Sequence, residues 1–113
     1  MDLDLDWCSP AACTLDPAAQ PERVAEWDAL FATAARSVRP VEGGVCVDLA
    51  PAPGRSSVVA DLADREAQCC DFLAFVLTVT SSTLLLAVTT DDEHAEVVAA
   101  LSRRARSLVG SDR

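Results

Sequence analysis

The segment "AFVLTVTSSTLLLAVTT", residues 74–90, decides which fold this chain is expected to adopt. It contains two runs of β-branched and large apolar residues, separated by Ser81-Ser82. Strands favour such residues, and a short polar connection between two such runs is typical of an antiparallel hairpin. We therefore predict a hairpin whose strands occupy residues 74–80 and 83–90.

A third strand is predicted at "VCVDL", residues 45–49, directly after a Gly-Gly turn. Apolar residues alternate there with Cys46 and Asp48, and a period of two places these two kinds of residue on opposite faces of a sheet. Cys46 is therefore expected to point away from the core. A further, short edge strand is predicted at residues 11–16.

Three helices complete the expected set of elements. Apolar residues recur every three or four positions after Pro21, and this spacing predicts an amphipathic helix that ends before Pro40. The same spacing predicts a second helix from about Ser56 to Phe72. Asp91 is expected to cap a final helix, because its side chain can accept hydrogen bonds from the backbone N–H groups of the first turn.

These elements predict a single α+β domain. A chain of 113 residues is long enough for one hydrophobic core but not for two. The expected order is (β)αβαββα, in which the bracketed element is the edge strand at residues 11–16. A mainly antiparallel sheet of three or four strands would then pack against three helices. Residues 1–10 are expected to form an acidic N-terminal tail, and residues 11–113 the domain.

The composition argues against two classes of partner. A formal charge of −9 would repel nucleic acids, whose binding depends on Lys and Arg. The basic residues Arg103, Arg104 and Arg106 fall near the end of the last predicted helix, where cations complement the helix dipole. No apolar stretch approaches the roughly 18 residues of a membrane span, and the acidic start does not resemble a signal peptide. We therefore expect a cytoplasmic protein with reduced cysteines and no nucleic-acid or membrane partner.

The group with the clearest chemical potential consists of Glu66, Cys69 and Cys70. Positions three and four residues apart lie on one face of a helix, so the Glu66 carboxylate should lie close to both thiols. Acidic residues surround the pair in the sequence. Such surroundings disfavour an activated thiolate nucleophile but favour a bound soft cation. The group therefore predicts a soft-metal site.

A further sulfur ligand is expected, because two adjacent cysteines form a poor chelate. Cys13 is the preferred partner, provided that its segment packs against the end of the second helix. Cys46 and Cys8 are weaker candidates, since they lie on a strand face and in the tail. The predicted ligands are therefore Cys13, Cys69 and Cys70, and the predicted ion is a soft metal such as mercury, copper, zinc or arsenic.

The aromatic residues and the single histidine are expected to have structural roles. His94 falls in the first turn of the last helix, where a solvated or capping role is expected rather than metal binding. Four aromatic residues have the spacing of core residues and are expected to pack in the interior: Trp27, Phe31, Phe72 and Phe75.

Several stretches of the chain resemble a known family. They are "ACTL" (12–15), "RVAEWDALFATA" (23–34), "GGVCVDL" (43–49), "EAQCCDFLAFVLTV" (66–79) and the final "LLLAVTT…VAAL". Over about residues 11–102 they resemble a small actinobacterial cysteine-containing domain that occurs alone or C-terminal to MerR-type (mercury-resistance-type) regulators. The resemblance implies thiol-dependent soft-metal handling, with Cys13, Cys69 and Cys70 as the thiols and Glu66 beside them.

Four functions remain open on the sequence. The first is stoichiometric binding of a thiophilic ion such as Hg²⁺, Cu⁺, Zn²⁺ or As(III). The second is enzymatic cleavage of a carbon–mercury bond, in which thiolates hold the metal and Glu66 acts as the acid. The third is thiol redox or sulfur-carrier chemistry. The fourth is an interaction domain whose cysteines only pack, because buried cysteine behaves as a small hydrophobe.

Overall fold

The computed structural model of the protein describes residues 20–109. Its elements follow the order αββαββα, with a short 3-10 helix before the last helix, and the predicted α+β class is confirmed. The predicted tail at residues 1–10 and the predicted edge strand at residues 11–16 lie outside the described residues. The bounds are α1 (Gln20–Ala34), β1 (Ala35–Val41), β2 (Gly44–Leu49), α2 (Arg55–Cys69), β3 (Ala74–Val79), β4 (Leu84–Thr89), η3 (Asp92–His94) and α3 (Ala95–Leu108).

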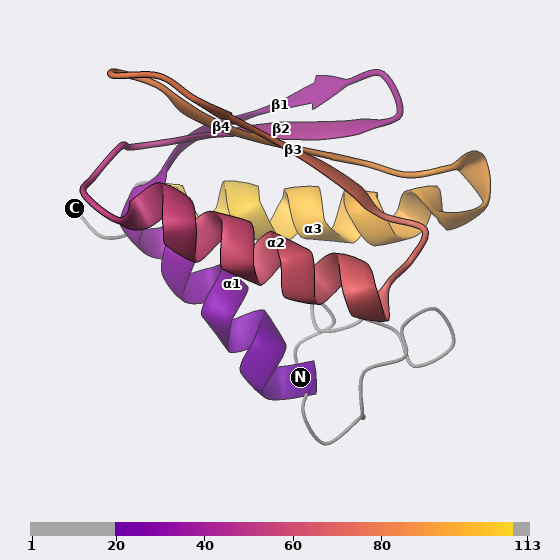
Figure 1. Cartoon of the computed structure of the whole chain (residues 1–113). Helices are drawn as coiled ribbons and strands as arrows, with labels where there is room; N and C mark the ends of the chain where they lie inside the picture. Colours follow the sequence, from indigo (N-terminus) through magenta and orange to yellow (C-terminus); the bar gives the residue numbers. More distant parts are fainter. Residues whose placement is uncertain (1–19, 110–113) are drawn as a thin grey trace.

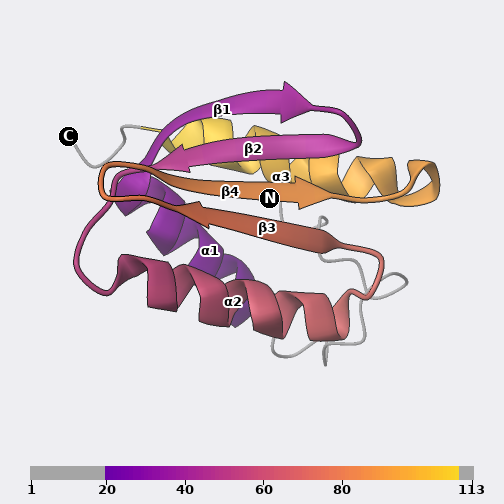
Figure 2. The same cartoon turned by 45° about the horizontal axis from the view of Figure 1, so that its top comes forward.

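The four strands form one antiparallel sheet in the spatial order β1-β2-β4-β3. All three helices lie on the same side of this sheet (Figure 1). α2 runs alongside β3, whereas α3 lies beneath β1 and β2 (Figure 2). The result is a two-layer domain in which a single core lies between the sheet and the helices.

The hairpin predicted from residues 74–90 is confirmed. β3 and β4 pair along their whole length, and a backbone hydrogen bond of 2.9 Å from Thr80 N–H to Thr83 C=O closes the connection. β4 also pairs with β2, so it is a central strand. Its alternate residues form part of the core: Leu84, Leu86 and Val88.

The prediction for residues 35–41 is wrong. The apolar spacing predicts that the first helix continues almost to Pro40, but the helix ends at Ala34 and β1 begins at Ala35. The cause is tertiary, because β1 gains a ladder of hydrogen bonds with β2. β1 is an edge strand, and an edge strand tolerates Pro40, whose missing N–H would disrupt a central strand.

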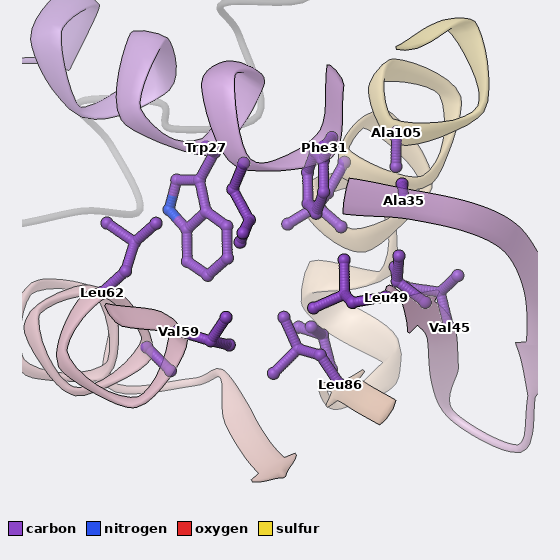
Figure 3. Close-up of a cluster of buried hydrophobic side chains, with 14 of the residues drawn as sticks. Trp27, Phe31, Ala35, Val45, Leu49, Val59, Leu62, Leu86 and Ala105 are labelled. Carbon is purple, nitrogen blue, oxygen red and sulfur yellow. The ribbon is translucent and has the colours of Figure 1, made fainter. Parts of the chain in front are cut away.

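The core places the aromatic residues of α1 against α2 and the sheet. Trp27 extends from α1 toward Val59 and Leu62 of α2 (Figure 3). Trp27 and Phe31 are buried, with ring centroids 5.7 Å apart, and Phe75 of β3 stacks on Trp27 at 6.1 Å. The predicted interior positions of Trp27 and Phe31 are therefore confirmed, whereas Phe75 is only partly buried and packs against the core. These contacts hold α1 close to α2.

The cap predicted at Asp91 is formed, but on the short 3-10 helix η3. The side chain of Asp91 accepts a hydrogen bond of 2.9 Å from the backbone N–H of His94. α3 itself begins at Ala95, and its N-cap residue His94 makes no side-chain capping hydrogen bond. Farther along α3, Arg104 donates two hydrogen bonds to Asp28 of α1, at 2.8 and 2.6 Å. One arginine of the basic group therefore links two helices. Among the described residues, no helix has both the length and the apolar character needed to cross a membrane.

Candidate metal centre

The end of α2 brings the two cysteines together. Cys69 is the last residue of the helix, and Cys70 has left the helical conformation, with φ −128° and ψ 81°. The backbone N–H of Cys70 still donates to the carbonyl of Glu66, at 2.8 Å, and Leu73 N–H donates to the carbonyl of Cys70, at 3.0 Å. Two adjacent residues inside a helix point in directions about 100° apart. The departure at Cys70 frees its side chain from that restriction, so both thiols can lie beside the same carboxylate.

The Glu66 carboxylate lies between the two thiols, as the helical spacing predicts. Glu66 Oε2 is 3.4 Å from Cys70 Sγ and 3.8 Å from Cys69 Sγ. One ligand atom from each of the three residues lies within 4.8 Å of the other two. The exposed fractions are 0% for Glu66, 9% for Cys69 and 1% for Cys70, so the group is closed to bulk solvent. These three residues, here called the thiol cluster, could hold a metal ion.

Two residues of α1 contact the thiol cluster. Arg23 Nη1 donates to Glu66 Oε1 at 3.2 Å, and Trp27 Nε1 donates to the same oxygen at 2.9 Å. Arg23 Nη1 also lies 3.5 Å from Cys69 Sγ. The two carboxylate oxygens therefore have different partners. Oε1 accepts hydrogen bonds from α1, while Oε2 faces the sulfur atoms.

Arg23 changes the electrostatics expected from the sequence. Its own burial lowers the pKa of the guanidinium, but hydrogen bonding and charge interaction with Glu66, together with Cys69, outweigh burial and raise that pKa above its ordinary value. A buried charge is tolerated when an opposite charge accompanies it. The thiol cluster is therefore not surrounded by acidic groups alone, because a permanent cation lies next to Glu66 and Cys69.

Arg23 is the residue that sequence reasoning missed, and Trp27 was expected only to pack. The sequence contains an indication of both contacts with Glu66. Arg23 precedes Trp27 by four positions, so the two residues lie on the same face of the first helix. An arginine on the apolar face of a helix needs a buried acceptor. Glu66 is the buried acid that meets this need.

The other predicted thiols are placed differently. Cys46 is a buried free thiol on β2. Cys46 is absent from the core cluster that contains its neighbours Val45 and Val47, but it is only 5% exposed, so burial does not alternate along this part of β2. Cys13, the predicted third ligand, and Cys8 lie outside the described residues.

A second group of possible ligands lies at the start of α3. It consists of Asp91, Glu93 and His94, of which the two acids are exposed. Its geometry has a structural explanation, because Asp91 caps the 3-10 helix η3 and its carboxylate also contacts His94 Nδ1 at 2.8 Å. The His94 ring stacks on Phe72, with centroids 3.9 Å apart. Asp91 therefore caps η3, and the His94 ring contacts Asp91 and Phe72 without capping α3.

Replacing Trp27 by phenylalanine should destabilise the protein by about 1.5–3 kcal/mol, the range for a hydrogen bond to a charged group. The new ring keeps most of the packing but cannot donate to Glu66 Oε1. Urea unfolding followed by circular dichroism measures the change. The same substitution in a Glu66→Met background should cost clearly less, and an equal cost in both backgrounds would show that the lost N–H does not matter.

The fold and the thiol cluster together define an α+β domain with a buried Glu/Cys/Cys group able to hold a metal ion. No protein-family model, curated protein or solved structure matches the chain. A fold alone does not establish a function, so the function has to be inferred from the chemistry of the cluster.

Proposed function

We propose that this protein binds a soft metal ion through thiols, with Cys69 and Cys70 as ligands supplied by α2. The observation that carries the proposal is the buried thiol cluster, whose three ligand atoms lie within 4.8 Å of one another. Thiolate sulfur prefers ions such as Hg²⁺, Cu⁺, Zn²⁺ and As(III) to hard cations.

The hydrogen bonds of Glu66 favour sulfur over oxygen as the principal ligand. Arg23 and Trp27 both donate to Oε1. Oε2 is therefore the carboxylate oxygen that can approach an ion. A site with two sulfur atoms and at most one carboxylate oxygen suits a thiophilic ion. Glu66 then serves mainly to position the thiols and to accept their protons when the ion binds.

Cys13 is proposed as the third sulfur ligand. The support is the resemblance of "ACTL" and "EAQCCDF" to the small actinobacterial cysteine-containing domain associated with MerR-type regulators. Three thiolates would bind a soft ion more firmly than two neighbouring ones. A reducing cytoplasm would keep these thiols available.

Mercury or copper ions should raise the melting temperature of the reduced protein, because the ion binds the folded state. Free ion at about 100 times Kd stabilises a protein by about 2.7 kcal/mol, a shift on the order of 10 °C for a domain of this size. Native mass spectrometry with a panel of soft ions measures stoichiometry and preference. Cys13→Ser should lose most of the shift, whereas the matched variant Cys46→Ser should keep it.

The outcomes separate the competing functions. Equal shifts in wild type and Cys13→Ser would remove Cys13 from the site. No ion bound by the reduced wild-type protein would contradict metal binding altogether. Thiol redox chemistry is the second candidate function, because Arg23 contacts Cys69 Sγ. Rapid alkylation of Cys69 by iodoacetamide, without any metal-dependent shift of the melting temperature, would favour it.

A further inference from the structure

The two carboxylate oxygens of Glu66 have different partners, and this difference suggests a chemical reaction at the thiol cluster in addition to metal binding. Oε1 is held by the N–H donors of Arg23 and Trp27. Oε2 faces both sulfur atoms, at 3.4 Å from Cys70 Sγ and 3.8 Å from Cys69 Sγ. A carboxylate that only balanced the charge of Arg23 would not need to contact two thiols with its second oxygen.

We propose that the thiol cluster cleaves the carbon–mercury bond of small organomercury cations by protonolysis, with Glu66 Oε2 carrying the proton. This inference rests on the proposed soft-metal binding, since the two thiols must first hold the mercury. Protonolysis needs two sulfur ligands for the metal and one acid within reach of the bound carbon. Glu66, Cys69 and Cys70 supply these three groups within 4.8 Å.

The step balances without any redox partner. The thiol of Cys69, beside Arg23, forms a sulfur–mercury bond with R–Hg–X, in which X is the solution ligand of the organomercury cation. X leaves together with the thiol proton as HX. Cys70 transfers its thiol proton to Glu66 Oε2 and forms the second sulfur–mercury bond. The protonated Glu66 then gives that proton to the carbon. The electron pair of the broken carbon–mercury bond forms the new C–H bond, so RH leaves and Hg(II) stays between two thiolates.

The N–H donors on Oε1 suit this proton transfer. Arg23 and Trp27 hold the carboxylate in one orientation, which keeps Oε2 directed at the sulfur atoms. Both donors belong to α1.

Burial limits the size of the substrate. Glu66 and Cys70 are exposed by 0% and 1%, and Cys69 by 9%. Cys69 is therefore the first contact for an incoming ion, and there is little room for a bulky organic group. Methylmercury, the smallest alkylmercury cation, is the appropriate probe.

The test is a single-turnover reaction of reduced protein with methylmercury in D₂O. Gas chromatography with mass detection should find CH₃D, one molecule per protein, while native mass spectrometry finds Hg(II) retained by the protein. Glu66→Gln should still bind methylmercury but release methane at least ~100-fold more slowly, the lower range for loss of a general acid. Cys46→Ser is the matched control and should react like wild type.

Cys70→Ser tests the inference independently if Glu66→Gln does not fold. It keeps Glu66, Arg23 and Cys69, so it should bind methylmercury through one sulfur and release no methane. Wild-type protein that binds Hg²⁺ but keeps methylmercury intact would overturn the cleavage and leave the proposed metal binding standing. Methane release by Glu66→Gln at the wild-type rate would also overturn it. Failure of wild type to bind Hg²⁺ would instead contradict the proposed function itself.

Discussion

Replacing Arg23 by methionine should lower the free energy of unfolding by about 3–5 kcal/mol, the cost of leaving one member of a buried ion pair without its partner. Glu66 is fully buried, and Arg23 Nη1 donates to it at 3.2 Å. Methionine has a similar length but no charge. Urea unfolding measures the change in the free energy of unfolding.

Two comparisons show whether burial is the cause. Arg36→Met removes an arginine whose ion pair with Asp48 is largely exposed, at 50% and 33% of the two side chains. Its cost should stay below about 1 kcal/mol. The double variant Arg23→Met/Glu66→Met removes both buried charges and should recover most of the lost stability. A loss as small for Arg23→Met as for Arg36→Met would contradict the assigned role of the buried pair.

Replacing Gly44 by alanine should cost more than about 4 kcal/mol, an exceptional value for a point substitution. Gly44 begins β2 and lies opposite Thr89 of β4. A Cβ atom there would lie 1.9 Å from the carbonyl oxygen of Val88 and 2.8 Å from the Cα of Thr89. Both atoms belong to the backbone, so the two central strands would have to separate. Thermal unfolding by circular dichroism, or loss of soluble folded protein, measures the result.

Gly54→Ala is the matched control for Gly44→Ala. Gly54 has φ +77°, and among the described residues no atom lies within 4 Å of its added Cβ. Its cost should be limited to the left-handed backbone penalty of roughly 1–2 kcal/mol. Equal losses at Gly44 and Gly54 would show that the contact with β4 is not the decisive factor.

The thiol cluster can be predicted from the sequence, whereas its contacts with α1 cannot. Helical spacing alone places Glu66 near Cys69 and Cys70, because all three lie within five consecutive residues. Arg23 and Trp27 reach Glu66 across 43 and 39 positions of the chain. That contact depends on how α1 packs against α2, and no pattern within either helix determines this packing.

The fold shows the same division between local and distant determinants. The hairpin of β3 and β4 follows from its residues, since both strands and the connection carry a local signal. β1 does not follow from its own residues, because Ala34 and Val38 continue the helical spacing of α1. Pairing with β2 nevertheless makes residues 35–41 a strand. The gain from pairing outweighs the local preference, as is common for edge strands.

The short span of the thiol cluster has a consequence for the unfolded chain. Cys69 and Cys70 remain neighbours when the domain is unfolded, so under the proposed function a newly made or denatured chain already offers both sulfur atoms to a soft ion, although only as a poor chelate. Binding to the unfolded state reduces the stabilisation that an ion gives to the native state. Arg23 and Trp27 reach Glu66 only after α1 has docked. The two proposed cysteine ligands are therefore adjacent from synthesis onward, but they gain their contacts with α1 only when the chain folds.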